Sequence, residues 1–389
     1  MAPDKSPPTR ATIPHDHGRV GGLFRFVSVL ALLYIFLFAI ALLGAAFKVF
    51  GSDFSKALIT STTNPVVGLM IGLLATSLIQ SSSSTTSIVV GLVAANALTV
   101  SNAIPIIMGA NMGTTVTNTI VAMTSLSRRS EFMRAFAGAT MHDFFNLLTI
   151  LILFPLEQAT HYLERSATWL SQHLIGSEAL EFQSPVKAAV KPTVNVVKHF
   201  LTDTVAAADW LAGTIMLVVS LGCIFFALTM LTKQMKRIFL RRAEGVLPRL
   251  VTSGGLTAML MGVVITVSVQ SSSITTSLLV PMIGAGIIPL ESAFAMTMGA
   301  NVGTTVTALL ASLAGNVAAV TVALVHLLFN ISGILIIYPF RPIRRIPINL
   351  ARNLAIRTAR RRIFALIYML GIFFALPLLF VLITKALAR

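Results

Sequence analysis

Two polar tracts of nearly the same sequence stand among long apolar stretches, and their side chains are of kinds that bind small ions. The first reads Gln80-Ser-Ser-Ser-Ser-Thr-Thr-Ser87 and the second Gln270-Ser-Ser-Ser-Ile-Thr-Thr-Ser277. Amide and hydroxyl oxygens are neutral ligands for a hard cation, whereas hydroxyl groups and the free N–H groups at the start of a helix suit an oxyanion. The tracts therefore indicate a site for an anion, a cation or both.

Two further motifs repeat in the same order, which indicates an internal duplication. Gly109-Ala-Asn-Met-Gly-Thr-Thr-Val-Thr117 returns as Gly299-Ala-Asn-Val-Gly-Thr-Thr-Val-Thr307, with the same offset of 190 residues as the polar tracts. The pattern His142-x-x-Phe-Asn146 returns as His326-x-x-Phe-Asn330, offset by 184. Three ordered matches are typical of the internal repeats of transporters.

The composition places these motifs in a membrane. Of 389 residues, 56% are hydrophobic and 11% are charged, whereas soluble domains carry about 25% charged residues. No ionisable residue occurs from Ala57 to Ser127, which is room for several spanning helices of about 20 residues each. We therefore expect an all-α polytopic membrane protein.

The net charge of +16 is distributed over short loops between apolar segments, as the positive-inside rule describes. This distribution favours anionic lipid as the partner of the basic loops and argues against nucleic acid. The lone Cys223 excludes a disulfide within the chain.

The basic loops also predict how the two repeats are inserted. Arginines stand in the middle of the first repeat, at Arg128, Arg129 and Arg134, and on both sides of the second, whose own middle loop near Asn316 is uncharged. Because short basic loops face the cytoplasm, the repeats should cross the membrane in opposite senses. We expect each inverted-topology repeat to contain a re-entrant helical hairpin with the polar tract at its tip, followed by a transmembrane helix broken at Gly-Ala-Asn-x-Gly-Thr-Thr.

These observations predict eight segments along the chain. They are a disordered cytoplasmic tail at 1–22, a flanking helix at 23–50, repeat 1 at 64–155, an extracellular or periplasmic loop at 156–210, a linking helix at 211–232, repeat 2 at 250–340, a basic cytoplasmic segment at 341–362 and a C-terminal membrane segment at 363–389. The side on which the C-terminus lies stays open, since Pro377 could turn the last segment into a hairpin.

Electrostatics predicts that an anion and a cation bind together. The two tips should meet near the middle of the membrane, where transporter sites lie, and their motifs contain no Lys or Arg. A helix N-terminus acts as about half a positive charge, which is too little to desolvate a dianion, so a co-bound cation would complete the neutralisation. His142 and His326 are interpreted as satisfied buried histidines in preference to proton carriers. Asp143, whose counterpart is Leu327, stands outside the shared motifs.

At these motifs the chain resembles the type II sodium-dependent phosphate cotransporters, in the form of a minimal, bacterial-type member. The resemblance extends from about residue 64 to 350 and includes Glu131-Phe-Met-Arg-Ala-Phe-Ala-Gly-Ala-Thr-Met-His-Asp-Phe-Phe-Asn146 and Arg345-Ile-Pro-Ile-Asn-Leu350. It implies symport of inorganic phosphate with sodium, without a cofactor, in the plasma membrane (the inner membrane of a bacterium) with the N-terminus in the cytoplasm. A homo-oligomer stays open.

The resemblance also assigns the site. It implies that phosphate and sodium bind at Gln80, Ser81, Ser82, Ser83, Gln270, Ser271, Ser272 and Ser273. By motif and position, the neighbouring elements of the site are Asn111, Thr114, Thr115, Asn301, Thr304 and Thr305. Sodium would use the same polar residues.

Three other functions stay as alternatives. The carrier could take another oxyanion, such as arsenate or sulfate; it could be a phosphate channel; or the chain could be a membrane scaffold, which would tolerate loss of the serine tracts. An enzyme is not expected, because the sequence offers no nucleophile–base pair and no metal-binding cluster.

Overall fold

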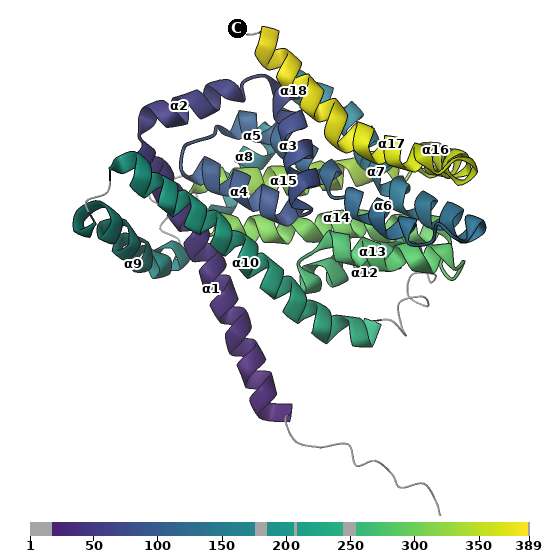
Figure 1. Ribbon diagram of the computed structural model, residues 1–389, viewed down its shortest axis with the longest axis horizontal. Coiled ribbons are helices and arrows are strands. Elements are labelled where there is room, and N and C mark those ends of the chain that lie inside the picture. Colours follow the sequence, from purple (N-terminus) through teal and green to yellow (C-terminus); the bar gives the residue numbers. More distant parts are fainter. Residues whose placement is uncertain (1–17, 176–184, 206–207, 244–253, 388–389) are drawn as a thin grey trace, which may run out of the picture.

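The computed structural model describes residues 18–175, 185–205, 208–243 and 254–387, and the regular structure in these ranges is all helical (Figure 1). The helices before residue 205 are α1 Gly18–Phe50, α2 Ser52–Ser61, α3 Pro65–Ile79, α4 Ser82–Ala94, α5 Val100–Gly113, α6 Val116–Met123, α7 Arg129–Thr160, α8 Tyr162–Ile175, α9 Pro185–His199 and the π-helical turn η2 Phe200–Thr204. Those that follow are α10 Asp209–Ala243, α12 Gly255–Val269, α13 Ser272–Gly284, α14 Leu290–Ser312, α15 Val317–Ile337, α16 Arg341–Arg360, α17 Ile363–Leu370, the π-helical turn η3 Gly371–Ala375 and α18 Leu376–Leu387.

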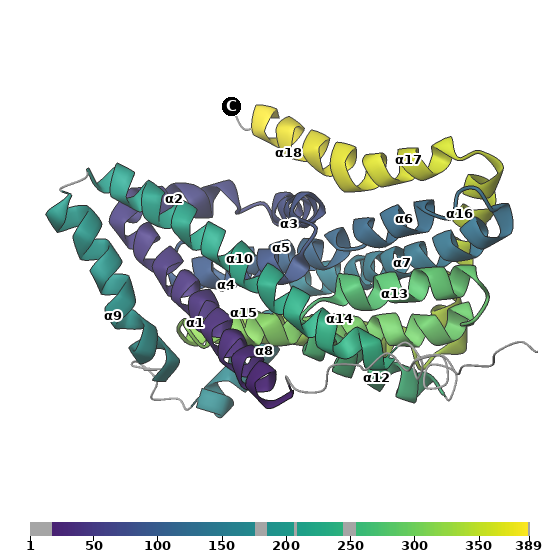
Figure 2. The ribbon, with the colours of Figure 1, turned by 60° about the horizontal axis from the view of Figure 1, so that its bottom comes forward.

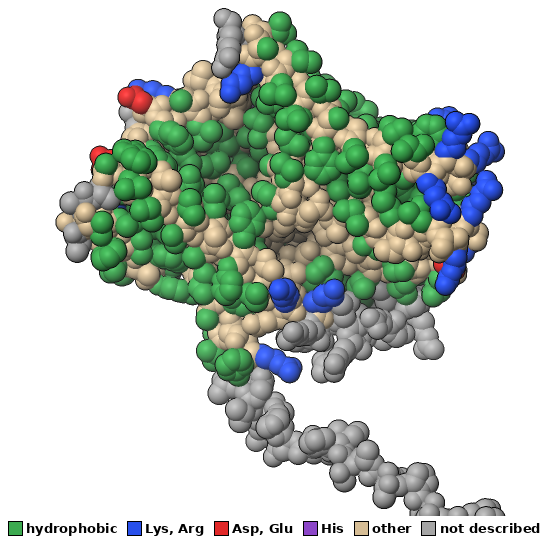
Figure 3. Space-filling view, viewed as in Figure 1, with side chains coloured by type: hydrophobic (Ala, Val, Ile, Leu, Met, Phe, Trp, Pro, Cys, Tyr) green, Lys and Arg blue, Asp and Glu red, His purple; other side chains and the backbone are tan. Residues whose placement is uncertain are grey.

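Six stretches of the described chain are long and apolar enough to cross a membrane. They lie in α1, α7, α10, α14 and α15 and in the continuous run of α17, η3 and α18. The apolar helices α4, α12 and α13 are shorter. Hydrophobic side chains also cover much of the face seen in Figure 3, as expected for a surface in contact with lipid. The prediction of an all-α polytopic membrane protein is confirmed.

Both polar tracts form the tips of short helical hairpins, one between α3 and α4 and one between α12 and α13. The first arm of each hairpin ends at a glutamine in the left-handed conformation, with φ of 60° at Gln80 and 56° at Gln270. This conformation is a common way to end a helix. The second arm then begins within two residues, so the turn at each tip is very tight.

Paired glycines bring each hairpin close to the next helix of its own repeat. A Cβ added to Gly72 on α3 would overlap the carbonyl oxygen of Ile106 on α5, and one on Gly109 would overlap that of Leu69. Gly262 and Gly299 make the same crossing between α12 and α14. Small residues at a crossing let backbones approach closely, so these glycines fix each tip against a long helix.

The second arm of each hairpin packs against the other repeat. Helix α4 contacts α14 and α15, and α13 contacts α6 and α7. One hydrophobic cluster joins Val90 of α4 to Ala311 of α14, and another joins Val280 of α13 to Phe136 of α7. The two repeats are therefore interlocked.

The expected break in the long helix occurs in repeat 1 but not in repeat 2. Helices α5 and α6 meet at a tight turn at Thr114 and Thr115, whereas α14 continues through the same motif, so the prediction of two broken helices was wrong for repeat 2. The motif is the same in both, so the break depends on its surroundings. Just after the break, Asn118 accepts hydrogen bonds from Thr276 and Ser277, while Ala308 stands at the equivalent place in α14.

Two other predicted segments can be compared with the helices. The segment 156–210, expected as an extracellular or periplasmic loop, contains the end of α7, all of α8 and α9, the π-helical turn η2 and the first residues of α10, while residues 176–184 and 206–207 lie outside the described residues. Helix α1 begins at Gly18, within the tail expected to extend to residue 22; residues 1–17 lie outside the described part of the chain.

Basic side chains gather at one end of the molecule, around α16 (Figure 3). The C-terminal segment does not form a hairpin at Pro377, because α17, η3 and α18 make one continuous stretch along the outside of the bundle (Figure 2). Helices α2 and α9 lie at the opposite end from α16 in both ribbon views. The molecule thus has one basic end that α16 crosses and another end occupied by α2 and α9.

Candidate functional site

Each hairpin tip presents the start of a helix lined with hydroxyl groups. The Ser81 hydroxyl caps α4 by accepting a hydrogen bond from the N–H of Ser84 at 3.2 Å, and Ser271 caps α13 through the N–H of Ile274 at 3.4 Å. The next two serines of each tract occupy the first turn of the helix and are buried. The first N–H groups of a helix have no partner within it, so both tips are suited to an anion.

The two tip glutamines make the same pair of contacts. The amide nitrogen of Gln80 donates to the carbonyl of Ser77, and its oxygen accepts a hydrogen bond from the Thr117 hydroxyl at 2.7 Å. Gln270 donates to Val267 at 2.7 Å and accepts from Thr307 at 2.8 Å. Gln80 therefore ties its tip to α6, and Gln270 ties its tip to α14.

A second polar cluster joins the two repeats and is reciprocal. Nε2 of His142 in repeat 1 lies 2.6 Å from Oδ1 of Asn301 in repeat 2. Nε2 of His326 in repeat 2 lies 3.4 Å from Oδ1 of Asn111 in repeat 1. All four residues are buried. An amide oxygen can only accept, so each histidine carries its proton on Nε2 in this arrangement.

Asn146 and Asn330 complete this network. Asn146 Oδ1 accepts from Asn301 at 2.8 Å and from Asn111 at 3.2 Å, and its amide donates to the Asn111 carbonyl at 3.1 Å. Asn330 accepts from Asn111 at 3.1 Å and donates to the His326 carbonyl at 3.0 Å. We refer to Asn111, His142, Asn146, Asn301, His326 and Asn330 together as the central network.

The structure thus divides the residues expected at the site into two groups. The glutamines and serines form the tips, whereas Asn111 and Asn301 belong to the central network. Thr304 and Thr305 donate to carbonyls of α14, and Thr115, at the break, donates to the carbonyl of Met112 at the end of α5. The Thr114 hydroxyl is buried, without a partner in the described structure. No hydrogen bond links the two tips to each other among the described residues.

Several residues that contact this region were not among the expected site residues. Thr117, Thr307, Asn146 and Asn330 all lie within the repeated motifs, so the repeat itself was the signal that could have found them. Asn118 and Asp143 have no polar counterpart in the other repeat. Asp143 is buried on α7 and accepts a hydrogen bond from the Tyr368 hydroxyl at 2.7 Å, and the Thr115 hydroxyl also lies close to its carboxyl group.

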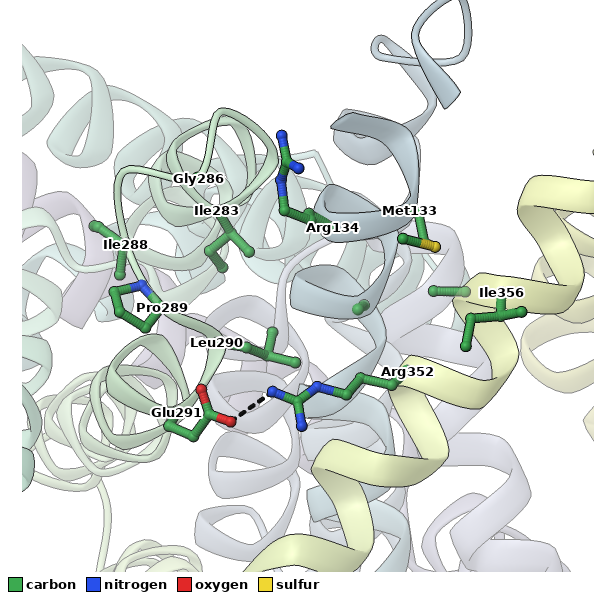
Figure 4. Close-up of a pocket in the computed structure, with 12 residues that line it drawn as sticks. Met133, Arg134, Ile283, Gly286, Ile288, Pro289, Leu290, Glu291, Arg352 and Ile356 are labelled. Carbon is green, nitrogen blue, oxygen red and sulfur yellow. Dashed lines mark hydrogen bonds and ion pairs between the residues drawn. The ribbon is translucent and has the colours of Figure 1, made fainter. Parts of the chain in front are cut away.

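A cavity of about 450 Å³ lies away from the tips, at the basic end of the molecule (Figure 4). Its wall includes the ion pair between Glu291 on α14 and Arg352 on α16, with 2.5 Å between the charged atoms. Arg134 of α7 also lines it and donates from Nε to the carbonyl of Gly284 in repeat 2. The contact of Arg134 joins the two repeats at that end, and the ion pair ties α16 to repeat 2. The cavity contains none of the serines or glutamines of the tips.

Comparison with known proteins gives a single family. The model of the Na+/Pi-cotransporter family matches residues 35–172 and 213–377, which is most of the chain. Human sodium-dependent phosphate transport protein 2B is 36% identical over 449 aligned residues, covering 92% of this chain and 65% of the relative. Rat protein 2A is 36% identical and the sheep protein 2A 37% identical, each covering 91% of this chain and 67% of the relative.

The chain spans about two thirds of the length of these curated relatives. No solved structure matches it. The matched residues contain both hairpin tips and the whole central network. On this evidence, the chain belongs to the Na+/Pi-cotransporter family.

Proposed function

We propose that this protein is a secondary active transporter that carries inorganic phosphate together with sodium. Its relatives are named as sodium-dependent phosphate transport proteins. The observation that carries the proposal is the matched pair of tips, each with a serine-capped helix start and a glutamine held by a threonine of the same repeat. A scaffold has no need of two such polar tips, whereas an ion carrier does.

Phosphate binds, in this proposal, between the hydroxyl groups and N–H groups at the starts of α4 and α13. Because these two helix ends supply only partial positive charge, sodium ions bind nearby through the neutral oxygens of the same tracts and complete the neutralisation. Each ion then raises the affinity of the other, and the effect is reciprocal. Asp143 adds a buried carboxyl group to repeat 1 alone. The net charge of the loaded carrier therefore depends on whether this carboxyl group is ionised.

The interlocked repeats support a carrier in preference to a channel. Each tip packs across the interface between repeats, so a change in the angle between the repeats would open the site first to one side and then to the other. The central network and the contact of Arg134 with Gly284 at the cavity of Figure 4 join the surfaces of the two repeats that such a motion would separate or slide. We place the protein in the plasma membrane, in the inner membrane if the source is bacterial, with α16 and the N-terminus on the cytoplasmic side.

The test is uptake of radiolabelled phosphate into proteoliposomes under an inward sodium gradient, with potassium replacing sodium as the control. We expect uptake only with sodium, and its loss in Gln80→Ala and in Gln270→Ala. Saturable uptake that proceeds equally with potassium would contradict sodium coupling. A rate that rises linearly with phosphate would indicate a channel. Competition by arsenate or sulfate measures selectivity among oxyanions.

A further inference from the structure

A second cavity, of about 250 Å³, lies at the end of the molecule opposite to α16 and is bordered by four lysines. Lys187, Lys191 and Lys198 come from α9, and Lys48 comes from the end of α1. Asn195 also lines the cavity, with no Asp or Glu among its lining residues. Because a water molecule takes roughly 30 Å³ of liquid, the cavity has room for a small hydrated anion.

The sequence of α9 places these side chains along one stripe of the helix. Positions 187, 191, 195 and 198 are spaced by four, four and three residues, which is one face of an α-helix. Val194 packs with Leu42 and Ala46 of α1, so the helix is held beside the cavity by apolar contacts. None of the four lysines lies within ion-pair distance of a carboxylate of the described residues. Asp203, on the exposed turn after α9, interacts electrostatically with Lys198 alone among the four.

The floor of the cavity belongs to the transport machinery. Ala94 ends helix α4, whose other end forms the first tip, and Ala314 and Gly315 form the middle loop of repeat 2. Asn316, next in that loop, donates to the carbonyl of Ala94 at 3.4 Å. The cavity therefore lies over the point where the two repeats meet at this end of the molecule.

We propose that this lysine cavity is an antechamber that captures inorganic phosphate before it reaches the hairpin tips. This inference rests on the proposed function and places the cavity on the non-cytoplasmic side, where phosphate enters. A lysine cluster on that side runs against the usual preference of basic residues for the cytoplasm, and attraction of an anionic substrate gives it a purpose. A cluster of like charges in a hollow raises the local concentration of an anion and its rate of association, by about tenfold or more at low salt.

The first experiment measures the KM and the maximal rate of sodium-dependent phosphate uptake in proteoliposomes of zwitterionic lipid. In the variant Lys187→Gln/Lys191→Gln/Lys198→Gln, we expect KM to rise about five- to tenfold at low ionic strength with an unchanged maximal rate. Salt near 0.15 M, set with choline chloride, should remove most of this difference in KM because the Debye length falls to about 8 Å. The triple Lys→Arg variant keeps the charge and should keep the KM. Lys56→Gln removes a positive charge from α2, at the same end of the molecule but outside the cavity, and should leave the KM unchanged.

An unchanged KM in the triple Gln variant would overturn the proposal, as would an equal rise in the triple Arg variant. An effect of the substitutions that occurs only in vesicles with anionic phospholipid would assign the cavity to a lipid headgroup and also overturn it. A second measurement does not depend on transport: line broadening of the ³¹P signal of phosphate by the purified protein without sodium. We expect weak binding that the triple Gln variant loses and that Gln80→Ala/Gln270→Ala keeps. If wild-type uptake proves independent of sodium, the proposed function fails while this binding test still decides on the antechamber.

Discussion

At the scale of single residues, the orientation of each tip glutamine depends on a hydrogen bond from a threonine hydroxyl of the same repeat. The Thr117 and Thr307 hydroxyls each donate to a glutamine oxygen. In Thr117→Val the shape is retained but the donor is lost, so Gln80 is no longer held in one orientation. We expect phosphate uptake to fall about three- to tenfold, the equivalent of one net hydrogen bond.

Thr117→Ser keeps the hydroxyl and should restore most of the uptake. The paired substitution Thr307→Val in repeat 2 provides an independent repetition of the test. Equal uptake by wild type and by both valine variants would show that the glutamines are positioned by something other than these threonines.

The central network allows a comparison of two equivalent residues. Asn146 accepts hydrogen bonds from both Asn111 and Asn301, whereas Asn330 accepts only from Asn111. In Asn146→Ala the buried amide of Asn301 loses its acceptor, at a cost of about 1–3 kcal/mol. In Asn330→Ala the amide nitrogen of Asn111 can still donate a hydrogen bond to Asn146. We expect thermal unfolding in detergent to show a clearly larger loss of stability for Asn146→Ala, and equal losses would contradict the network as described.

The tip residues could be predicted from the sequence, but their roles could not be separated. The repeated tracts identify Gln80 and Gln270 because polar side chains inside the membrane are costly unless they have partners or bind a ligand. Nothing in the spacing shows that Asn111 contacts His326 rather than the tips, since that contact joins residues 215 apart in the chain. The reciprocal pairing of the repeats is a property of the folded molecule.

At the scale of elements, the glycine crossings hold each tip in place. Gly109→Ala would push the new methyl group into the Leu69 carbonyl and force α3 and α5 apart. Overpacking of this kind costs about 1–3 kcal/mol, and here it also displaces the first tip. We therefore expect lower thermal stability together with a loss of uptake.

Gly222→Ala is the matched control for this substitution, because a Cβ at Gly222 on α10 meets nothing within 4 Å. It should leave uptake unchanged and stability unchanged or slightly higher, since alanine favours a helix over glycine by about 1 kcal/mol. If Gly109→Ala behaved like this control, the close crossing of α3 and α5 would be wrong.

The hairpins and long helices were predicted from the sequence, whereas the helices of 156–210 were not. Mixed charge in that segment indicated a loop, but α9 buries Val190 and Val194 at a spacing of four, and α8 buries Leu163 and Ala167 in the same way. Short amphipathic helices are easily missed when charge content is weighed above periodicity. The continuity of α14 could not be predicted either, because the same motif interrupts the helix in repeat 1 and lies within a continuous helix in repeat 2.

At the scale of the whole molecule, the middle loops of the two repeats differ in charge in a way that predicts its orientation in the membrane. Arginines of α16 and of the loop before α7 mark one end, and α2 and α9 mark the other (Figures 1 and 3). If the repeats are inverted, the middle loop of repeat 1 and the middle loop of repeat 2 lie on opposite sides of the membrane. The positive-inside rule places the first of these in the cytoplasm.

Cysteine labelling tests this orientation directly, because Cys223 is the only cysteine in the chain. On a Cys223→Ala background, Leu313→Cys in the middle of repeat 2 should react with a membrane-impermeant maleimide added outside intact cells. Arg128→Cys in the middle of repeat 1 should react only after permeabilisation, and Arg345→Cys on α16 should behave like it. Lys56→Cys on α2 is the control for the outer side. Labelling of Arg128→Cys and Leu313→Cys from the same side would exclude inverted insertion, and with it an alternating-access motion built on two oppositely oriented repeats.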